Sequence, residues 1–277
     1  MSNKIKFSNI VMISEVPIEI NQYFSFYNID GVACLHWNDK PKIYRENTPT
    51  IFLQAMKIAF PQIHVYPNTI DGKSIFDDFK SYIIDYFSVD QRIDIVNDYK
   101  TKLDDKVKQI CDIHKKLILH HEKLHEKKQE DYLDFWNVAF NKYLEACDCT
   151  SVERGIETLI SCLETLIVDA MSEISYRTSL FTALAYTDNQ EKRKEVFAFV
   201  KSMYNVRSKV IHGDLGAIKK YMNKHTMFDD YLSLKEIVST VLMKMYEENK
   251  EAYLSIMQES IFNTVIKQKD NITSQGV

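Results

Sequence analysis

Arg207 and His212 are the residues of this 277-residue chain whose types and spacing point most directly to chemistry. They lie in the segment MYNVRSKVIHGD, residues 203–214. An imidazole exchanges protons near neutral pH, and a planar guanidinium matches the oxygens of a phosphate. Together they could hold a phosphate and move protons during its transfer. The spacing alone is weak evidence, because a chain of this composition contains roughly 0.5 such pairs by chance.

Arg207 falls inside the apolar face of the helix predicted over 190–212. At about 100° per residue, with Val196 at zero, Arg207 lies near 20°, in the middle of the apolar residues. A guanidinium stays charged, so burying it without a partner is very costly. It requires a carboxylate, a subunit interface or an anionic ligand. The structural alternatives are an internal ion pair with a glutamate and a side chain that extends out to solvent.

His212 stands at the predicted end of the same helix, since the glycine that follows, Gly213, is typical of a helix C-terminus. The negative end of the helix dipole favours a positively charged side chain there, and a histidine can act as a general acid. The same charge also stabilises a helix end without any catalysis. The two interpretations are compatible.

Three segments that occur in order extend this pattern: IETLISCLETLI (156–167), ISYRTSLFTALA (174–185) and SMYNVRSKVIHGD (202–214). The segment FWNVAFNKYLEAC (135–147) precedes them. Together they resemble the Apea-like branch of the HEPN superfamily, over about residues 130–250. The resemblance does not extend to residues 1–88.

The resemblance implies a helical bundle that dimerises around an Arg-x4-6-His motif and acts as a metal-independent endoribonuclease without a cofactor. His212 would be the general acid/base, and Arg207 would hold the scissile phosphate. The 2′-hydroxyl of RNA would attack that phosphate and leave a 2′,3′-cyclic phosphate. The resemblance also makes Ser208, Lys209 and Arg177 candidates for RNA contacts, although a structural ion pair explains Arg177 equally well.

Two biological roles are compatible with this family. Many members of this branch degrade RNA in defence against phage, which would make this chain an antiviral effector. Others in the superfamily are catalytically inactive and bind a partner protein or RNA through the same helices. Because a constitutively active ribonuclease would harm its host, we expect a regulatory partner, for which residues 1–88 are the remaining surface.

A competing motif, HEKLH, begins at His121 and matches the H-E-x-x-H pattern of zinc peptidases. The i, i+4 spacing would place His121 and His125 on one helix face beside Glu122. Real sites of this kind are lined by uncharged residues, whereas this segment continues as EKKQED. We therefore interpret it as a charged helix face exposed to solvent and expect no metal.

The composition indicates a soluble chain with a net charge of −4, so that any RNA binding must use a local basic patch. No segment has the roughly 20 apolar residues of a membrane span, and the N-terminus lacks the features of a signal peptide. The cysteines form no paired framework, which favours a reducing cytoplasm. They are Cys34, Cys111, Cys147, Cys149 and Cys162.

The pattern along the chain predicts a mainly α protein. Residues 1–88 contain every proline and several short β-type runs, which predicts a small mixed α/β region with one helix over 50–60. Residues 89–128 predict a long charged helix, and 129–270 the HEPN-type bundle. The individual helices are expected at 91–128, 131–146, 152–186, 190–212, 214–225, 229–248 and 250–268.

Overall fold

The computed structural model describes the helices and strands named below and the side chains of residues 51–59, 61, 108–123, 134–167, 173–246 and 255. The chain divides into two compact units, Met1–Tyr132 and Leu133–Val277. Nearly all the residues with described side chains are helical, and the prediction of a mainly α protein is confirmed.

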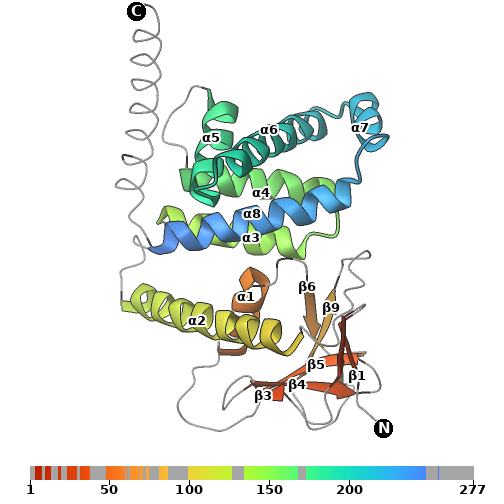
Figure 1. Ribbon diagram of the computed structural model, residues 1–277, viewed down its shortest axis with the longest axis vertical. Helices are drawn as coiled ribbons and strands as arrows, with labels where there is room; N and C mark the ends of the chain where they lie inside the picture. Colours follow the sequence, from red (N-terminus) through yellow and green to blue (C-terminus); the bar gives the residue numbers. More distant parts are fainter. Residues whose placement is uncertain are drawn as a thin grey trace, which may run out of the picture. The chain divides into compact units, whose positions relative to one another are not determined.

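The first unit combines β-strands with two helices (Figure 1). One antiparallel sheet has the strand order β3-β4-β5-β9-β6, and two further pairs are β1-β2 and β7-β8. The strands are β1 (Lys4–Phe7), β2 (Ile10–Ile13), β3 (Ile18–Glu19), β4 (Phe24–Ile29), β5 (Val32–Trp37), β6 (Ile63–Pro67), β7 (Thr69–Ile70), β8 (Lys73–Ser74) and β9 (Ser81–Tyr86).

Helices α1 (Thr48–Ala59) and α2 (Tyr99–Glu126) pack against each other through apolar faces with helical spacing. Phe52, Ala55 and Met56 are buried on α1, and Ile110 and Leu117 are buried on α2. The predicted start of the long helix, residues 91–98, lies outside the described residues.

The second unit contains α3 (Phe135–Asp148), α4 (Val152–Ile167), α5 (Ile174–Tyr186), α6 (Gln190–Ile211), α7 (Leu215–Met222) and α8 (Met227–Glu247). Helix α4 contacts α3, α5, α6 and α8, so that its apolar residues form the centre of the core. Figure 1 shows α7 beyond the end of α6. The fully buried apolar residues of α4 with large side chains are Ile156, Leu159, Ile160, Leu163, Leu166 and Ile167.

Polar side chains determine where the helices of this unit begin. Asp134 caps α3 by accepting a hydrogen bond of 2.7 Å from the amide of Asn137. Asn189 caps α6 in the same way, through the amide of Lys192. At the start of α4, Oγ of Ser151 accepts a hydrogen bond of 3.3 Å from the amide of Arg154. These bonds satisfy amides that have no partner within the helix.

The prediction of one continuous helix over 152–186 is wrong. Helix α4 ends at Ile167, and α5 begins at Ile174 after Glu173, whose φ of 56° is left-handed. Apolar spacing was compatible with a continuous helix. A left-handed non-glycine residue interrupts a helix, and the hydrophobic pattern carries no information about it.

The other helices of the second unit lie close to their predicted positions, with ends that differ by a few residues. The third helix starts at Phe135 instead of residue 131, because Asp134 caps it there. Helix α7 ends at Met222, earlier than the predicted residue 225. The last predicted helix, 250–268, lies outside the described residues except for Ser255, which is helical.

Gly155 of α4 is a site where a side chain has no space. A Cβ at this position would lie 2.5 Å from Cε2 of Tyr231. The ring of Tyr231 cannot easily yield, because its hydroxyl donates a 2.6 Å hydrogen bond to the carbonyl of Ala146. We therefore expect Gly155→Ala to reduce the free energy of unfolding by about 1–3 kcal/mol, despite the better helix propensity of alanine.

Gly216→Ala is the matched control for Gly155→Ala. A Cβ at Gly216 would meet its nearest atom, Oδ1 of Asp214, at an ordinary 3.7 Å. This change should leave the stability unchanged or raise it by up to about 1 kcal/mol. Urea denaturation of the two variants tests the expectation, and equal effects at both positions would show that the contact with Tyr231 does not matter.

Because of His114 on α2, we expect the stability of the first unit to depend on pH. Its side chain is buried and makes a T-shaped contact with the ring of Phe52, and burial lowers its pKa from 6.5 to about 4. Between these values the unfolded chain binds more protons than the folded one, so stability falls as the pH drops from 6.5 towards 4. The loss has an upper limit of about 3 kcal/mol.

Thermal unfolding between pH 7 and pH 4 measures this effect. His114→Leu should unfold with a shallower pH dependence than the wild type, because it removes the titrating group. His225→Gln, at an exposed position, should retain the wild-type pH dependence. An identical pH profile for His114→Leu and the wild type would contradict the assignment.

Candidate functional site

Helix α6 places the Arg207–His212 motif at the end of a packed helix. Val196, Val200, Met203 and Val206 are buried, which anchors α6 against the core along one face. Arg207 shares the angular position of these residues on the helix wheel, and its side chain is 22% exposed. The side chain therefore continues the buried face towards the end of α6 but is only partly buried.

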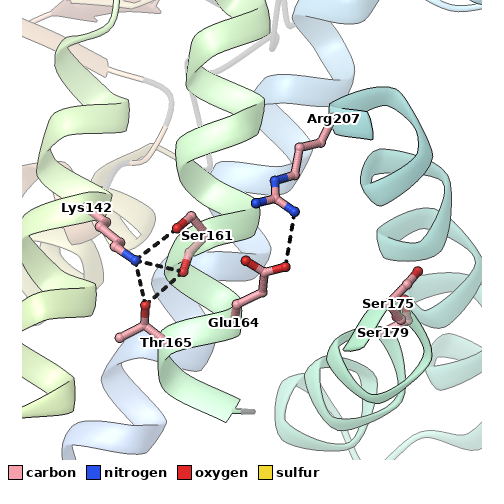
Figure 2. Close-up of polar contacts among 7 residues, drawn as sticks. All are labelled: Lys142, Ser161, Glu164, Thr165, Ser175, Ser179 and Arg207. Atoms are coloured by element: carbon pink, nitrogen blue, oxygen red, sulfur yellow. Dashed lines mark hydrogen bonds and ion pairs between the residues drawn. The ribbon is translucent and has the colours of Figure 1, made fainter. Parts of the chain in front are cut away.

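Arg207 has an anionic partner within its own chain. Its Nη1 donates a 3.2 Å hydrogen bond to Oε1 of Glu164 on α4, and both side chains are 22% exposed (Figure 2). The structural alternative, an internal ion pair, is present, because α4 and α6 pack closely enough for the two side chains to meet.

Tyr204 completes a small polar cluster with Glu164 and Arg207. The guanidinium carbon of Arg207 lies 5.4 Å from the centre of the Tyr204 ring, which is within the range of a cation–π contact. Burial and the neighbouring Glu164 carboxylate raise the pKa of the Tyr204 hydroxyl. The cluster fixes the plane of the guanidinium but leaves its buried Nε without a hydrogen-bond acceptor among the described residues.

His212 occupies the C-cap of α6, and its side chain is exposed. Gly213 follows with a φ of 67°, as expected for a helix that ends in a left-handed glycine. Its amide donates to the carbonyl of Val210, and the amide of Asp214 donates to Lys209 at 2.9 Å. These two bonds define a Schellman motif, which ends the helix and leaves the imidazole at the surface.

The structure brings some of the predicted site residues together and leaves others apart. Ser208 and Lys209 lie between Arg207 and His212 on the last turns of α6, with Ser208 exposed and Lys209 partly exposed. Arg177 lies on α5, and its buried Nε has no hydrogen-bond partner among the described residues. None of the contacts in the described part of the chain joins Arg177 to Arg207 or His212.

Glu164 and Tyr204 are the members of the cluster that the sequence analysis did not single out. Glu164 lies in the segment ISCLETLI, at about 80° from Ile156 on the wheel of α4, beside the apolar face. A carboxylate at the border of a buried face was the available signal for an arginine partner. The pairing itself required knowledge of which two helices face each other.

A second polar cluster fixes α3 to α4. Nζ of Lys142 donates hydrogen bonds to Oγ of Ser161 at 2.9 Å and to Oγ1 of Thr165 at 2.8 Å (Figure 2). Ser161 and Thr165 lie one helical turn apart and flank Glu164 in sequence. The lysine therefore helps to set the rotation of α4 about its axis and, with it, the position of the Glu164 carboxylate.

The H-E-x-x-H segment lies near the end of α2, where Glu122 and Lys123 are exposed. Nε2 of His121 lies 3.4 Å from Oε1 of Gln54 on α1. The His125 side chain is outside the described residues. Within the described part of the chain, no group of three or more His, Cys, Asp or Glu side chains could hold a metal ion.

None of the described helices is long and apolar enough to cross a membrane.

A double-mutant cycle on Glu164→Gln and Arg207→Gln measures the strength of the ion pair. Because both side chains are largely shielded from solvent, we expect a coupling of about 1–2 kcal/mol in the free energy of unfolding. The exposed pair Glu191–Lys194, at 2.8 Å, is the control, with an expected coupling below about 0.5 kcal/mol. Equal coupling in both cycles would show that Glu164 does not hold Arg207.

Comparison of the chain with protein-family models, with curated proteins and with solved structures finds no match in any of the three.

Proposed function

We propose that the protein is a metal-independent endoribonuclease of the HEPN type. The main support for the proposal is the set of contacts that Arg207 makes and its position near the end of α6. Its guanidinium is oriented by Glu164 and Tyr204, keeps an unsatisfied Nε, and lies within the last two turns of a helix that ends at the exposed His212. A pre-oriented cation and a proton-transfer group are the two components that phosphoryl transfer requires.

In the proposed reaction, the 2′-oxygen of RNA attacks the adjacent phosphorus while its proton passes to a base. The bond from phosphorus to the 5′-oxygen breaks, and that oxygen receives a proton. His212 is the acid/base, and Arg207 compensates the charge that develops on the phosphate oxygens. Ser208, Lys209 and Arg177 contact RNA outside the reacting bond. The products are a 2′,3′-cyclic phosphate and a 5′-hydroxyl.

The active species in this proposal is a homodimer in which two motifs share one cleft. The surface beside His212 supports it, since Ile211 is 49% exposed and Leu215 is 68% exposed. Apolar side chains of this size that remain exposed beside a candidate site favour an interface. A role in cytoplasmic antiviral defence, with residues 1–88 as the surface for a regulatory partner, completes the proposal.

One observation favours a second function, that of a catalytically silent helical module. Glu164 already neutralises Arg207, so that the arginine is stabilised without any bound phosphate. In a silent module the pair would serve only to join α4 to α6. The two functions differ in what the loss of His212 does, because this exposed side chain has no role in the packing of the helices.

Incubation of the full-length protein with labelled single-stranded and structured RNA in EDTA separates these functions. The first predicts cleavage to products with 2′,3′-cyclic phosphate ends. His212→Ala should reduce the rate at least about 100-fold, because it removes the proton-transfer group. Arg207→Ala should act similarly, because it removes the phosphate ligand. Asn205→Ala, an exposed position on the same helix, should retain the wild-type rate.

Two outcomes would reject the nuclease proposal. An inert wild type, together with unchanged stability of His212→Ala, would favour the silent module. Cleavage that EDTA abolishes and that His121→Ala reduces would instead assign the activity to the H-E-x-x-H segment.

A further inference from the structure

Helix α7 and its C-terminal turn form a basic surface next to the candidate site. Between Ser208 and Thr226 the sequence contains four lysines and one carboxylate, Asp214, in a chain whose net charge is −4. Asp214 is occupied as the N-cap of α7, where it accepts a 3.0 Å hydrogen bond from the amide of Ala217. This segment is thus locally positive within an acidic protein.

The lysines of this surface differ from those at the other end of α6. Lys192 and Lys194 form ion pairs with Glu195 and Glu191 at 3.0 and 2.8 Å. Lys219, Lys220 and Lys224 are exposed, and none of them pairs with a described carboxylate. Two of them lie in the last turn of α7, where they complement the helix dipole. Dipole compensation does not account for Lys224, which follows the helix.

An aromatic pair lies beside these lysines. The rings of Tyr221 and His225 are stacked, with centroids 4.6 Å apart and an angle of 10° between their planes. The Tyr221 hydroxyl donates a 2.6 Å hydrogen bond to Oδ2 of Asp230 on α8, which holds the inner ring in place. His225 is the outer, exposed ring. An exposed flat ring on a fixed support is a suitable surface for an unpaired base.

Helix α7 contributes little to the core of the unit. None of its residues is buried, although it contacts α6. Its eight residues span about 12 Å at roughly 1.5 Å per residue. The helix begins three residues after His212, so that a strand bound along it would continue into the candidate site.

We propose that α7 and the turn after it bind the backbone of a single-stranded RNA that continues from the scissile bond, with Lys219, Lys220 and Lys224 on its phosphates and His225 stacked on a base. The inference rests on the proposed function for the identity of the ligand. It adds a binding surface for nucleotides outside the reacting bond and makes a longer single strand the preferred substrate.

The test measures the binding of a fluorescein-labelled single-stranded 12-nucleotide RNA to the full-length protein that carries His212→Ala, so that no cleavage occurs. In this background, Lys219→Ala/Lys220→Ala/Lys224→Ala should weaken binding at least about tenfold at low salt. It should also reduce the slope of log affinity against log salt by about 2, since each phosphate contact on a single strand contributes roughly 0.7.

The control variant Lys192→Ala/Lys194→Ala/Lys201→Ala also removes three lysines, but from α6. It should bind the RNA almost as tightly as the parent protein that carries only His212→Ala. His225→Ala should weaken binding about fivefold or more, and His225→Trp should restore it, because a larger ring stacks at least as well. A purely structural role of His225 would not produce this rescue.

The inference would be overturned if the α7 triple variant and the control variant had the same salt slope, or if both lost the same amount of affinity for the RNA. The same result is expected if the lysines of α7 bind an acidic protein and not RNA. The proposed nuclease fails separately, when the wild type does not cleave RNA. Binding that depends on α7 in that case would still support the RNA surface.

Discussion

The apolar face of α4 is the constraint on which the second unit depends. Helices α3, α5, α6 and α8 all contact α4, and its large apolar side chains are fully removed from water. Polar residues on such a helix can lie only at the borders between its neighbours. Ser161 and Thr165 meet Lys142 at one border, and Glu164 meets Arg207 at another (Figure 2). The candidate site is therefore a consequence of how the central helix is covered.

The end of α6 has a different physical origin. The Schellman motif at Gly213 satisfies the last carbonyl groups of the helix through local hydrogen bonds alone. No tertiary contact is required to end the helix, so that the His212 side chain remains in solvent and α7 starts directly afterwards. The buried side chain of Val206 and the exposed imidazole of His212 thus lie within six residues of each other at the end of the same helix.

The Arg207–Glu164 pair is compatible with catalysis and with a structural role, and the same physics explains both. A carboxylate offsets the cost of partly burying a guanidinium, and it also restricts the guanidinium to one orientation. Orientation before the substrate binds is valuable for the stabilisation of a transition state. The same carboxylate would also compete with a bound phosphate, because Glu164 already occupies one side of the Arg207 guanidinium.

Apolar spacing and capping residues act over a few neighbouring positions, so that the helices between 135 and 247 could be predicted from the sequence apart from the break before α5. The end of α6 at His212 and Gly213 and the place of Arg207 within an apolar face could be predicted in the same way. Tertiary packing alone sets the break before α5 and the partner of Arg207. A left-handed Glu173 leaves no mark on hydrophobic periodicity. The contact of Arg207 with Glu164 joins residues that are 43 positions apart, so it exists only once α4 and α6 have packed together.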